Sequence, residues 1–317
     1  MLRLSFFLKS FLLFLCGLLG AVQAQGTPST HGRNNPLVGE TIADRPSTLY
    51  RFEKHRIESA DGKRRYRIEI SVPRTPAPKT GYPVLYLLDG NAAMATLTEQ
   101  DLAAISATNP PVLVALGYDV PTRNDAVSRA YDYTPPVYEN GTLVAEPVVR
   151  GRVGGGADIF LQFITSRIKP LVRAHASIDP NREYLWGHSY GGLFTLHTLF
   201  TQPDAFARYI TGDPSAWWYD GALMQTWHAF DKSRAAGKRI AILVGTKPRD
   251  AARPAPSSPA SQKNGPPAKD PHAAVREIAD GLRLGGAAAS YETFPQYGHG
   301  DMIRVSLERA LQIATEP

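Results

Sequence analysis

Short, nearly continuous apolar runs recur along the chain and set its predicted architecture. They cover residues 83–88, 112–116 and 240–244. Runs of this kind are typical of strands that are buried on both faces of a parallel sheet. Segments with helical spacing separate them; in the segment over 158–174, Asp158 is placed to cap the first turn and Pro170 to kink or end the helix. This alternation predicts an α/β fold with a mostly parallel central sheet and helices on both faces.

A second pattern, alternation of polar and apolar residues, occurs nearer the N-terminus. It covers 51–57 and 65–72, on either side of Asp61-Gly62, as expected for a β-hairpin. The residues before it, 25–48, are rich in Gly, Pro, Asn and Thr and have no period, which predicts a mobile lead-in.

One domain is predicted over the rest of the chain, from 49 to 317. Residues 249–271 are dense in Pro, Ala, Ser and Lys without a period, but strand-like and helix-like segments resume after them. We therefore interpret 249–271 as a mobile surface loop within the domain rather than as a boundary.

The first 24 residues have the pattern of a secretory signal. Arg3 and Lys9 precede an almost wholly apolar stretch at 11–22, and the small residues of a predicted cleavage site follow, with the cut after Ala24. Cleavage there would remove Cys16, the only cysteine, so the mature chain would have neither an internal disulfide nor a cysteine nucleophile. An uncleaved signal would instead anchor the protein to a membrane, which is the one membrane contact that the sequence predicts.

Composition and charge narrow the possible partners. The chain is 43% hydrophobic and 20% charged, which excludes a disordered chain and a coiled coil. Its formal charge of +6 is scattered rather than gathered in runs. This favours an anionic ligand over a nucleic-acid groove, and we predict no nucleic-acid partner.

The sharpest chemical signal is the pentapeptide Gly187-His188-Ser189-Tyr190-Gly191. A strand-like segment, 183–186, precedes it and a helix-like segment, 192–200, follows it, which is the frame of a nucleophile elbow. Ser189 is then the candidate nucleophile, and the backbone N–H of Tyr190 a candidate oxyanion donor. The second donor is expected from Gly90 or Asn91, in the loop after an earlier strand.

A serine nucleophile needs a base, and His299 is placed to act as one. It follows the strand-like 291–294 and precedes a C-terminal helix from Met302. The acid is expected after the penultimate strand, where only Asp250 is available; without it, a Ser-His dyad helped by a backbone carbonyl would remain. No histidine pair has the spacing of a metal motif, so we predict no metal and no cofactor.

A candidate substrate rim combines a cation with aromatic rings. Arg129, Trp217 and Trp218 are suited to a planar, anionic, aromatic ligand through stacking and cation–π contacts. Two alternatives stay open. The tryptophans are core or rim packing, or Arg129 is structural and pairs with Asp132.

Several of these segments together resemble the esterase D-like α/β-hydrolases, and most of all the periplasmic trilactone esterases of catecholate siderophores, which hydrolyse enterobactin and salmochelin. They are residues 83–91, 129–135, 187–192, 213–218 and 298–300. The resemblance implies the α/β-hydrolase fold, a periplasmic location, Ser189 as nucleophile, His299 as base, Tyr190 as oxyanion donor and Arg129 near a catecholate. It also implies a Ser-His dyad.

The predicted function is therefore a serine esterase that opens the trilactone backbone of an enterobactin-like siderophore, including its ferric complex, and so releases iron. We expect a monomer. One alternative is a general secreted carboxylesterase or acyltransferase with the same site. Another is an inactive siderophore-binding protein, which would require Ser189 and His299 to lie far apart.

Overall fold

The computed structural model describes residues 35–248 and 272–316. The predicted signal, residues 25–34 of the lead-in, the Pro/Ala-rich segment 249–271 and with it Asp250 lie outside the described residues. Within the described ranges, no helix is both long and apolar enough to cross a bilayer.

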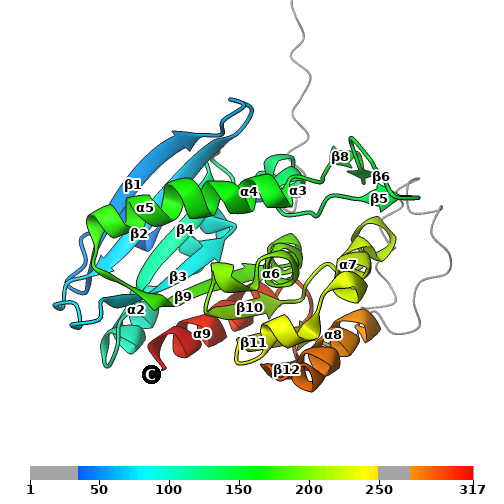
Figure 1. The fold of residues 1–317 in the computed structure, drawn as a ribbon. Coiled ribbons are helices and arrows are strands. Elements are labelled where there is room, and N and C mark those ends of the chain that lie inside the picture. The colour runs from blue at the N-terminus through cyan, green and yellow to red at the C-terminus, as the bar shows by residue number, and fades with distance from the viewer. Residues whose placement is uncertain (1–34, 249–271, 317) are drawn as a thin grey trace, which may run out of the picture. The chain divides into compact units, whose positions relative to one another are not determined.

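The described residues form one large sheet of eight strands, ordered β1-β2-β4-β3-β9-β10-β11-β12 (Figure 1). The strands are β1 (Tyr50–Glu58), β2 (Arg65–Pro73), β3 (Tyr82–Leu88), β4 (Val112–Tyr118), β9 (Ile178–His188), β10 (Arg208–Gly212), β11 (Arg239–Gly245) and β12 (Ala288–Phe294). The β1–β2 and β2–β4 pairings are antiparallel and the others are parallel. Both the predicted hairpin and the mostly parallel sheet are therefore confirmed.

Nine helices are found in the described residues, and α9 follows the last strand. They are α1 (Gly90–Met94), α2 (Glu99–Ser106), α3 (Ser128–Asp132), α4 (Ala157–Phe163), α5 (Lys169–His175), α6 (Tyr190–Thr201), α7 (Trp218–Ala229), α8 (Ala273–Leu284) and α9 (Met302–Thr315), with short 3₁₀ turns at Ile42–Asp44, Pro203–Ala205 and Lys232–Ala235. Two small hairpins, β5 (Tyr138–Glu139) with β6 (Thr142–Leu143) and β7 (Val148–Val149) with β8 (Arg152–Val153), lie between α3 and α4.

Alternate residues of each central strand belong to opposite cores, because successive side chains of a strand point to opposite faces. In β3, Val84, Tyr86 and Leu88 belong to the core on one face, which also contains residues of α4, α5, α6 and α8, whereas Leu85 and Leu87 belong to the core on the other face, with residues of α2 and α9. Both faces of the sheet are covered (Figure 1), which explains why the strands read as unbroken apolar runs.

The segment predicted as one helix over 158–174 is built from three parts. Gly156, not Asp158, is the N-cap of α4, so the predicted cap is wrong; the Asp158 carboxylate instead lies 2.7 Å from His197 Nε2. A π-helical turn at Ile164–Ile168 joins α4 to α5. Pro170 lies at the start of α5, directly after this π-helical turn, so the break in the α-helical pattern coincides with the residue that lacks an N–H.

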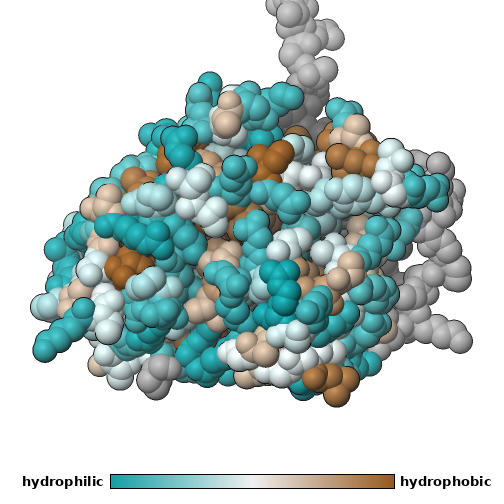
Figure 2. Space-filling model, in the orientation of Figure 1, coloured by the Kyte–Doolittle hydropathy of each residue, from teal (hydrophilic) through white to brown (hydrophobic). Residues whose placement is uncertain are grey.

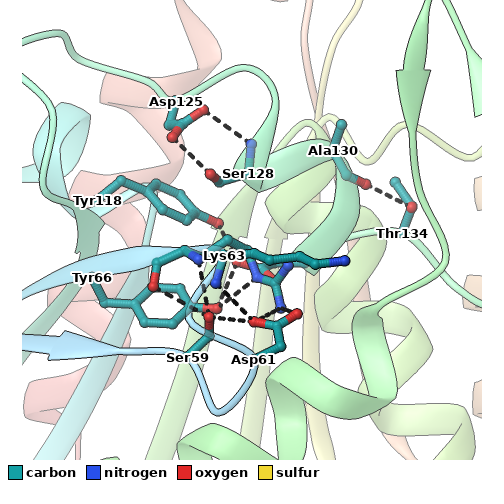
Figure 3. A network of polar contacts seen from close by, with 11 residues as sticks. Ser59, Asp61, Lys63, Tyr66, Tyr118, Asp125, Ser128, Ala130 and Thr134 are labelled. Carbon is teal, nitrogen blue, oxygen red and sulfur yellow. Dashed lines mark hydrogen bonds and ion pairs between the residues drawn. The ribbon is translucent and has the colours of Figure 1, made fainter.

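A buried polar network fixes α3 against the sheet (Figure 3). The Asp132 carboxylate lies 3.0 Å from Arg64 Nε and accepts hydrogen bonds from the hydroxyls of Tyr66 and Tyr118, each at 3.0 Å. Burial raises the pKa of Asp132 to about 7, against the opposing effects of Arg64 and the two hydroxyls. Because α3 also carries Arg129, this network sets the position of a predicted site residue.

Candidate active site

Ser189 occupies a strained turn between β9 and α6. Its backbone angles are φ 60° and ψ −115°, a combination that a non-glycine residue rarely adopts. A Cβ on Gly187 would lie 2.3 Å from the Gly191 carbonyl oxygen, and one on Gly192 would lie 2.5 Å from Thr211 Oγ1. The glycines thus allow the turn to pack closely while the serine stays at its tip.

His299 faces Ser189 from the loop between β12 and α9. Its Nε2 lies 3.1 Å from Ser189 Oγ, within hydrogen-bonding distance. His188 also contacts this loop, because its Nε2 lies 2.9 Å from the His299 carbonyl oxygen. Burial is the main cause that lowers the pKa of His188 to about 3, and the nearby His299 is the second. His188 is therefore neutral and donates its one N–H to that carbonyl.

Asp213, which our sequence reasoning did not assign as the acid, lies behind His299. Its Oδ2 is 3.4 Å from His299 Nδ1, an ion-pair distance, and its Oδ1 accepts a 2.9 Å hydrogen bond from the Gly245 N–H. It follows β10 directly, and Gly212 of β10 pairs with His188 of β9, so the register brings Asp213 beside the elbow. The signal that we overlooked was an Asp at the carboxyl end of the strand after the elbow strand, one strand earlier than expected for Asp250.

Two helix N-termini near the elbow supply candidate oxyanion donors. The first intrahelical bond of α6 runs from the Leu193 N–H to the Ser189 carbonyl, which leaves the Tyr190 N–H outside the helical ladder. In α1 the first bond runs from Ala93 to Asp89, which leaves the N–H groups of Gly90 and Asn91 outside it. The Asn91 side chain is not available, because its amide bonds the backbone of 118–122.

Arg129 pairs with Asp89, not with Asp132. Its Nε and Nη2 each donate a 2.7 Å hydrogen bond to one oxygen of Asp89, a bidentate pair in which the carboxylate side chain is 6% exposed. The guanidinium also lies 5.1 Å from the centre of the Tyr190 ring. Arg129 therefore ties α3 to the end of β3 and packs against the residue that follows the nucleophile.

We expect Arg129→Met to lower the free energy of unfolding by about 3–5 kcal/mol, because it leaves the buried Asp89 carboxylate without its cation. Urea unfolding followed by circular dichroism measures this loss. Arg150→Met is the matched control; Arg150 is exposed, and its replacement is expected to change stability by less than about 0.5 kcal/mol. Equal effects of the two changes would contradict a structural role for the Arg129–Asp89 pair.

The exposed rim beside the elbow contains Trp217 and Arg150. Trp217 is 47% exposed, its ring centre lies 6.1 Å from that of Tyr190, and the Arg150 guanidinium lies 4.3 Å from its centre. Burial raises the pKa of Tyr190, against the opposing effects of Arg150, Arg129 and Arg152. Arg150 and Arg152 come from the β7–β8 hairpin and were missed, because nothing in their local sequence links them to the elbow.

Trp218 does not belong to this rim. Its side chain is 1% exposed and packs in the core, so the prediction that it contacts substrate is wrong, and the core-packing alternative holds for this tryptophan.

On the face drawn in Figure 2, most of the surface is hydrophilic and the hydrophobic residues lie in separate small patches. Near the rim, Tyr138, Leu143 and Val148 of the two small hairpins are each more than half exposed, at 52%, 54% and 52%.

Comparison with known proteins decides the family. The Esterase family model matches residues 59–270. The chain is also 35% identical to the apo-salmochelin esterase of Escherichia coli O6:H1, over 86% of this chain and 82% of that protein. The chain belongs to the esterase family.

Other relatives of this esterase agree in sequence and in structure. It is 32% identical to the ferri-bacillibactin esterase BesA of Bacillus subtilis, over 85% of this chain and 91% of that protein. The solved structure of the enterobactin and salmochelin hydrolase IroE matches with a TM-score of 0.71 at 34% identity, covering 87% of this chain and 99% of that one. A second structure of that hydrolase, in complex with DFP, matches equally well.

The esterase is a serine hydrolase with the α/β-hydrolase fold, and its geometry suits acyl transfer. A serine hydroxyl on a strained turn, an imidazole in hydrogen-bonding contact and a carboxylate behind the imidazole are the groups that such chemistry needs. The backbone N–H groups at the starts of α6 and α1 are candidates to stabilise the oxyanion.

Proposed function

We propose that this esterase hydrolyses the trilactone backbone of a catecholate siderophore. The observation that carries the proposal is the placement of the Ser189–His299 pair beside an exposed, arginine-covered Trp217. A catechol ring is flat and its oxygens carry negative charge when they bind iron, so it can stack on an indole and meet guanidinium groups at its edge. An ordinary alkyl ester would use neither feature.

The proposed reaction proceeds through an acyl-enzyme. Ser189 Oγ attacks a lactone carbonyl carbon while His299 Nε2 takes the hydroxyl proton, and the N–H of Tyr190, with that of Gly90 or Asn91, stabilises the oxyanion. Collapse breaks the bond between the carbonyl carbon and the ring oxygen, and His299 returns its proton to that alkoxide. Water then hydrolyses the acyl-enzyme by the same steps and regenerates Ser189.

Opening the ring provides a reason for iron release. A macrocycle preorganises its donor oxygens around the metal, and a linear product loses that advantage. The named relatives include both an apo-siderophore and a ferri-siderophore esterase, so we include both forms as candidate substrates. Residues 1–24 have the pattern of a secretory signal, and we propose that the esterase acts as a monomer in the periplasm.

Substrate comparison tests this proposal directly. The purified protein is incubated with iron-free enterobactin, ferric enterobactin and p-nitrophenyl butyrate, and the linear trimer, dimer and monomer are separated by chromatography. We expect kcat/KM for at least one enterobactin form to exceed that for the simple ester by about tenfold or more. Turnover of the simple ester alone would favour a general carboxylesterase, and turnover of none of the three substrates would contradict the proposal.

We expect Trp217→Ala to raise KM for enterobactin by about fivefold to tenfold, because a stacking contact of roughly 1 kcal/mol or more is lost. Its kcat/KM for p-nitrophenyl butyrate should stay within about twofold of the wild-type value, since the small ester does not need the indole. Trp217→Phe, which keeps a ring, should recover part of the enterobactin KM. A parallel loss on both substrates would contradict a role in recognition.

A further inference from the structure

Two histidines and a glutamate meet at the edge of the sheet, outside the candidate active site. Glu53 and His55 are alternate residues of β1 and therefore share a face of that strand. His175 is the last residue of α5, and its Nδ1 bonds the Glu53 carboxylate. The rings of His55 and His175 have centres 4.9 Å apart. Residues 120 positions apart in sequence thus form one cluster, which no local spacing motif predicts.

The donor atoms of this cluster converge. Each of the three residues offers one ligand atom, a ring nitrogen from His55 and His175 and a carboxylate oxygen from Glu53, and these atoms all lie within 4.8 Å of one another. Donor atoms around a tetrahedral zinc ion are about 3.3 Å apart, given metal–ligand bonds of about 2.0–2.2 Å. The separations of Glu53 Oε2 from the two imidazole nitrogens lie on either side of that value, since His55 Nε2 is 3.9 Å away and His175 Nδ1 is in direct contact.

The unbonded nitrogen of His55, Nε2, is a second observation that points to a bound metal ion. The atom is buried and makes no hydrogen bond within the part of the chain that the structure describes, although the ring itself is only partly buried. A buried polar atom without a hydrogen bond costs free energy, whereas coordination to a metal ion would satisfy it.

Arg51 orients the other ligands. It bonds Glu53 Oε1, which leaves Oε2 facing the two histidines, and it also donates to the backbone carbonyl of His175. Contacts of this kind fix the orientation of ligating side chains in metal sites. Glu53, His55 and His175 are each about a quarter exposed, so an ion could enter from solvent and keep water in its remaining position.

We propose that Glu53, His55 and His175 form a binding site for a divalent transition-metal ion such as zinc, with His55 Nε2, His175 Nδ1 and Glu53 Oε2 as ligands. Two imidazoles and one carboxylate are a donor set that zinc and its neighbours accept. The site would tie the end of α5 to β1. Since β1 pairs only with β2 in the described part of the sheet, such a tie would stabilise an edge strand. It is separated from the elbow strand β9 by β2, β4 and β3, so its role would be structural rather than catalytic.

Zinc titration of the untagged, EDTA-treated protein tests the proposal, by isothermal titration calorimetry and by thermal unfolding. Zinc should bind and raise the unfolding temperature, because an ion that binds only the folded state stabilises it. His55→Ala, His175→Ala and Glu53→Gln should each weaken binding by about tenfold or more. Copper bound in place of zinc should give an electron paramagnetic resonance signal of two nitrogen ligands, reduced to one in His55→Ala.

Two controls separate this site from other histidines. His228→Ala removes an exposed imidazole that pairs with Glu277 at 3.3 Å, and it should leave zinc affinity unchanged. His299→Ala disrupts the other cluster, formed with His188 and Asp213, and it too should retain the site at the sheet edge. Wild-type affinity in both His55→Ala and His175→Ala, or zinc binding that only His299→Ala abolishes, would overturn the proposal. Circular dichroism of the metal-free variants, together with the milder change His55→Gln, identifies any loss that reflects misfolding.

Discussion

Replacing Ser189 with alanine is expected to lower kcat by at least about 10⁴-fold on every ester that the protein hydrolyses. The hydroxyl lies 3.1 Å from His299 Nε2 at the tip of the elbow, so its removal leaves the base with no proton to take and the carbonyl with no nucleophile. Any residual rate would come from substrate binding and the oxyanion donors. Single-turnover assays with p-nitrophenyl butyrate and enterobactin, with the variant at high concentration, measure this drop.

Ser215→Ala is the matched control for this prediction. Ser215 Oγ lies 3.3 Å from Ser189 Oγ, but Ser215 is 2% exposed and does not face solvent at the turn. We expect its loss to change kcat by less than about tenfold, as for one hydrogen bond. Labelling by an organophosphate should stop in Ser189→Ala and continue in Ser215→Ala. Persistent activity of Ser189→Ala would remove Ser189 from the mechanism and with it the proposed reaction.

Asp213→Asn is expected to lower kcat by about 10²- to 10⁴-fold with little change in KM. The carboxylate lies 3.4 Å from His299 Nδ1, where its charge stabilises the imidazolium that forms when His299 takes the serine proton. An amide has almost the same shape but no charge, and the Gly245 N–H can still bond its oxygen. Steady-state kinetics on p-nitrophenyl butyrate measure the effect, and circular dichroism checks the fold.

Asp250→Asn distinguishes the two candidate acids. We expect it to retain the wild-type kcat within about twofold if Asp213 serves His299. A large loss in Asp250→Asn together with wild-type activity in Asp213→Asn would assign the acid to Asp250. If neither change lowered kcat by more than about fivefold, a Ser-His dyad would be sufficient, as the family resemblance implies.

Much of the site was accessible from the sequence, and the failures share a cause. Ser189 and His299 were found because each lies in a distinctive local pattern, a glycine-bounded turn between a strand and a helix and a loop after the last strand. Asp213 was missed although its segment had been noticed, because a rule about strand position was applied one strand too late. Trp217 and Trp218 are adjacent in sequence, yet one is half exposed and the other buried.

Pairings between distant residues were beyond the sequence. Arg129 was predicted to contact substrate, with pairing to Asp132 as the structural alternative; it bonds Asp89 across 40 positions, while Asp132 pairs with Arg64. The cluster of Glu53, His55 and His175 likewise has no local signature.

The sequence by itself determined the succession of strands and helices along the chain, the elbow at Ser189 and the placement of His299 after the last strand. These features depend on burial periodicity and on turn geometry, both of which act over a few residues. Only the tertiary structure decided which carboxylate lies behind His299, which acid holds Arg129 and which histidines meet at the sheet edge. Those contacts depend on the order of the strands within the sheet and on their register, which bring together residues that no short-range pattern relates.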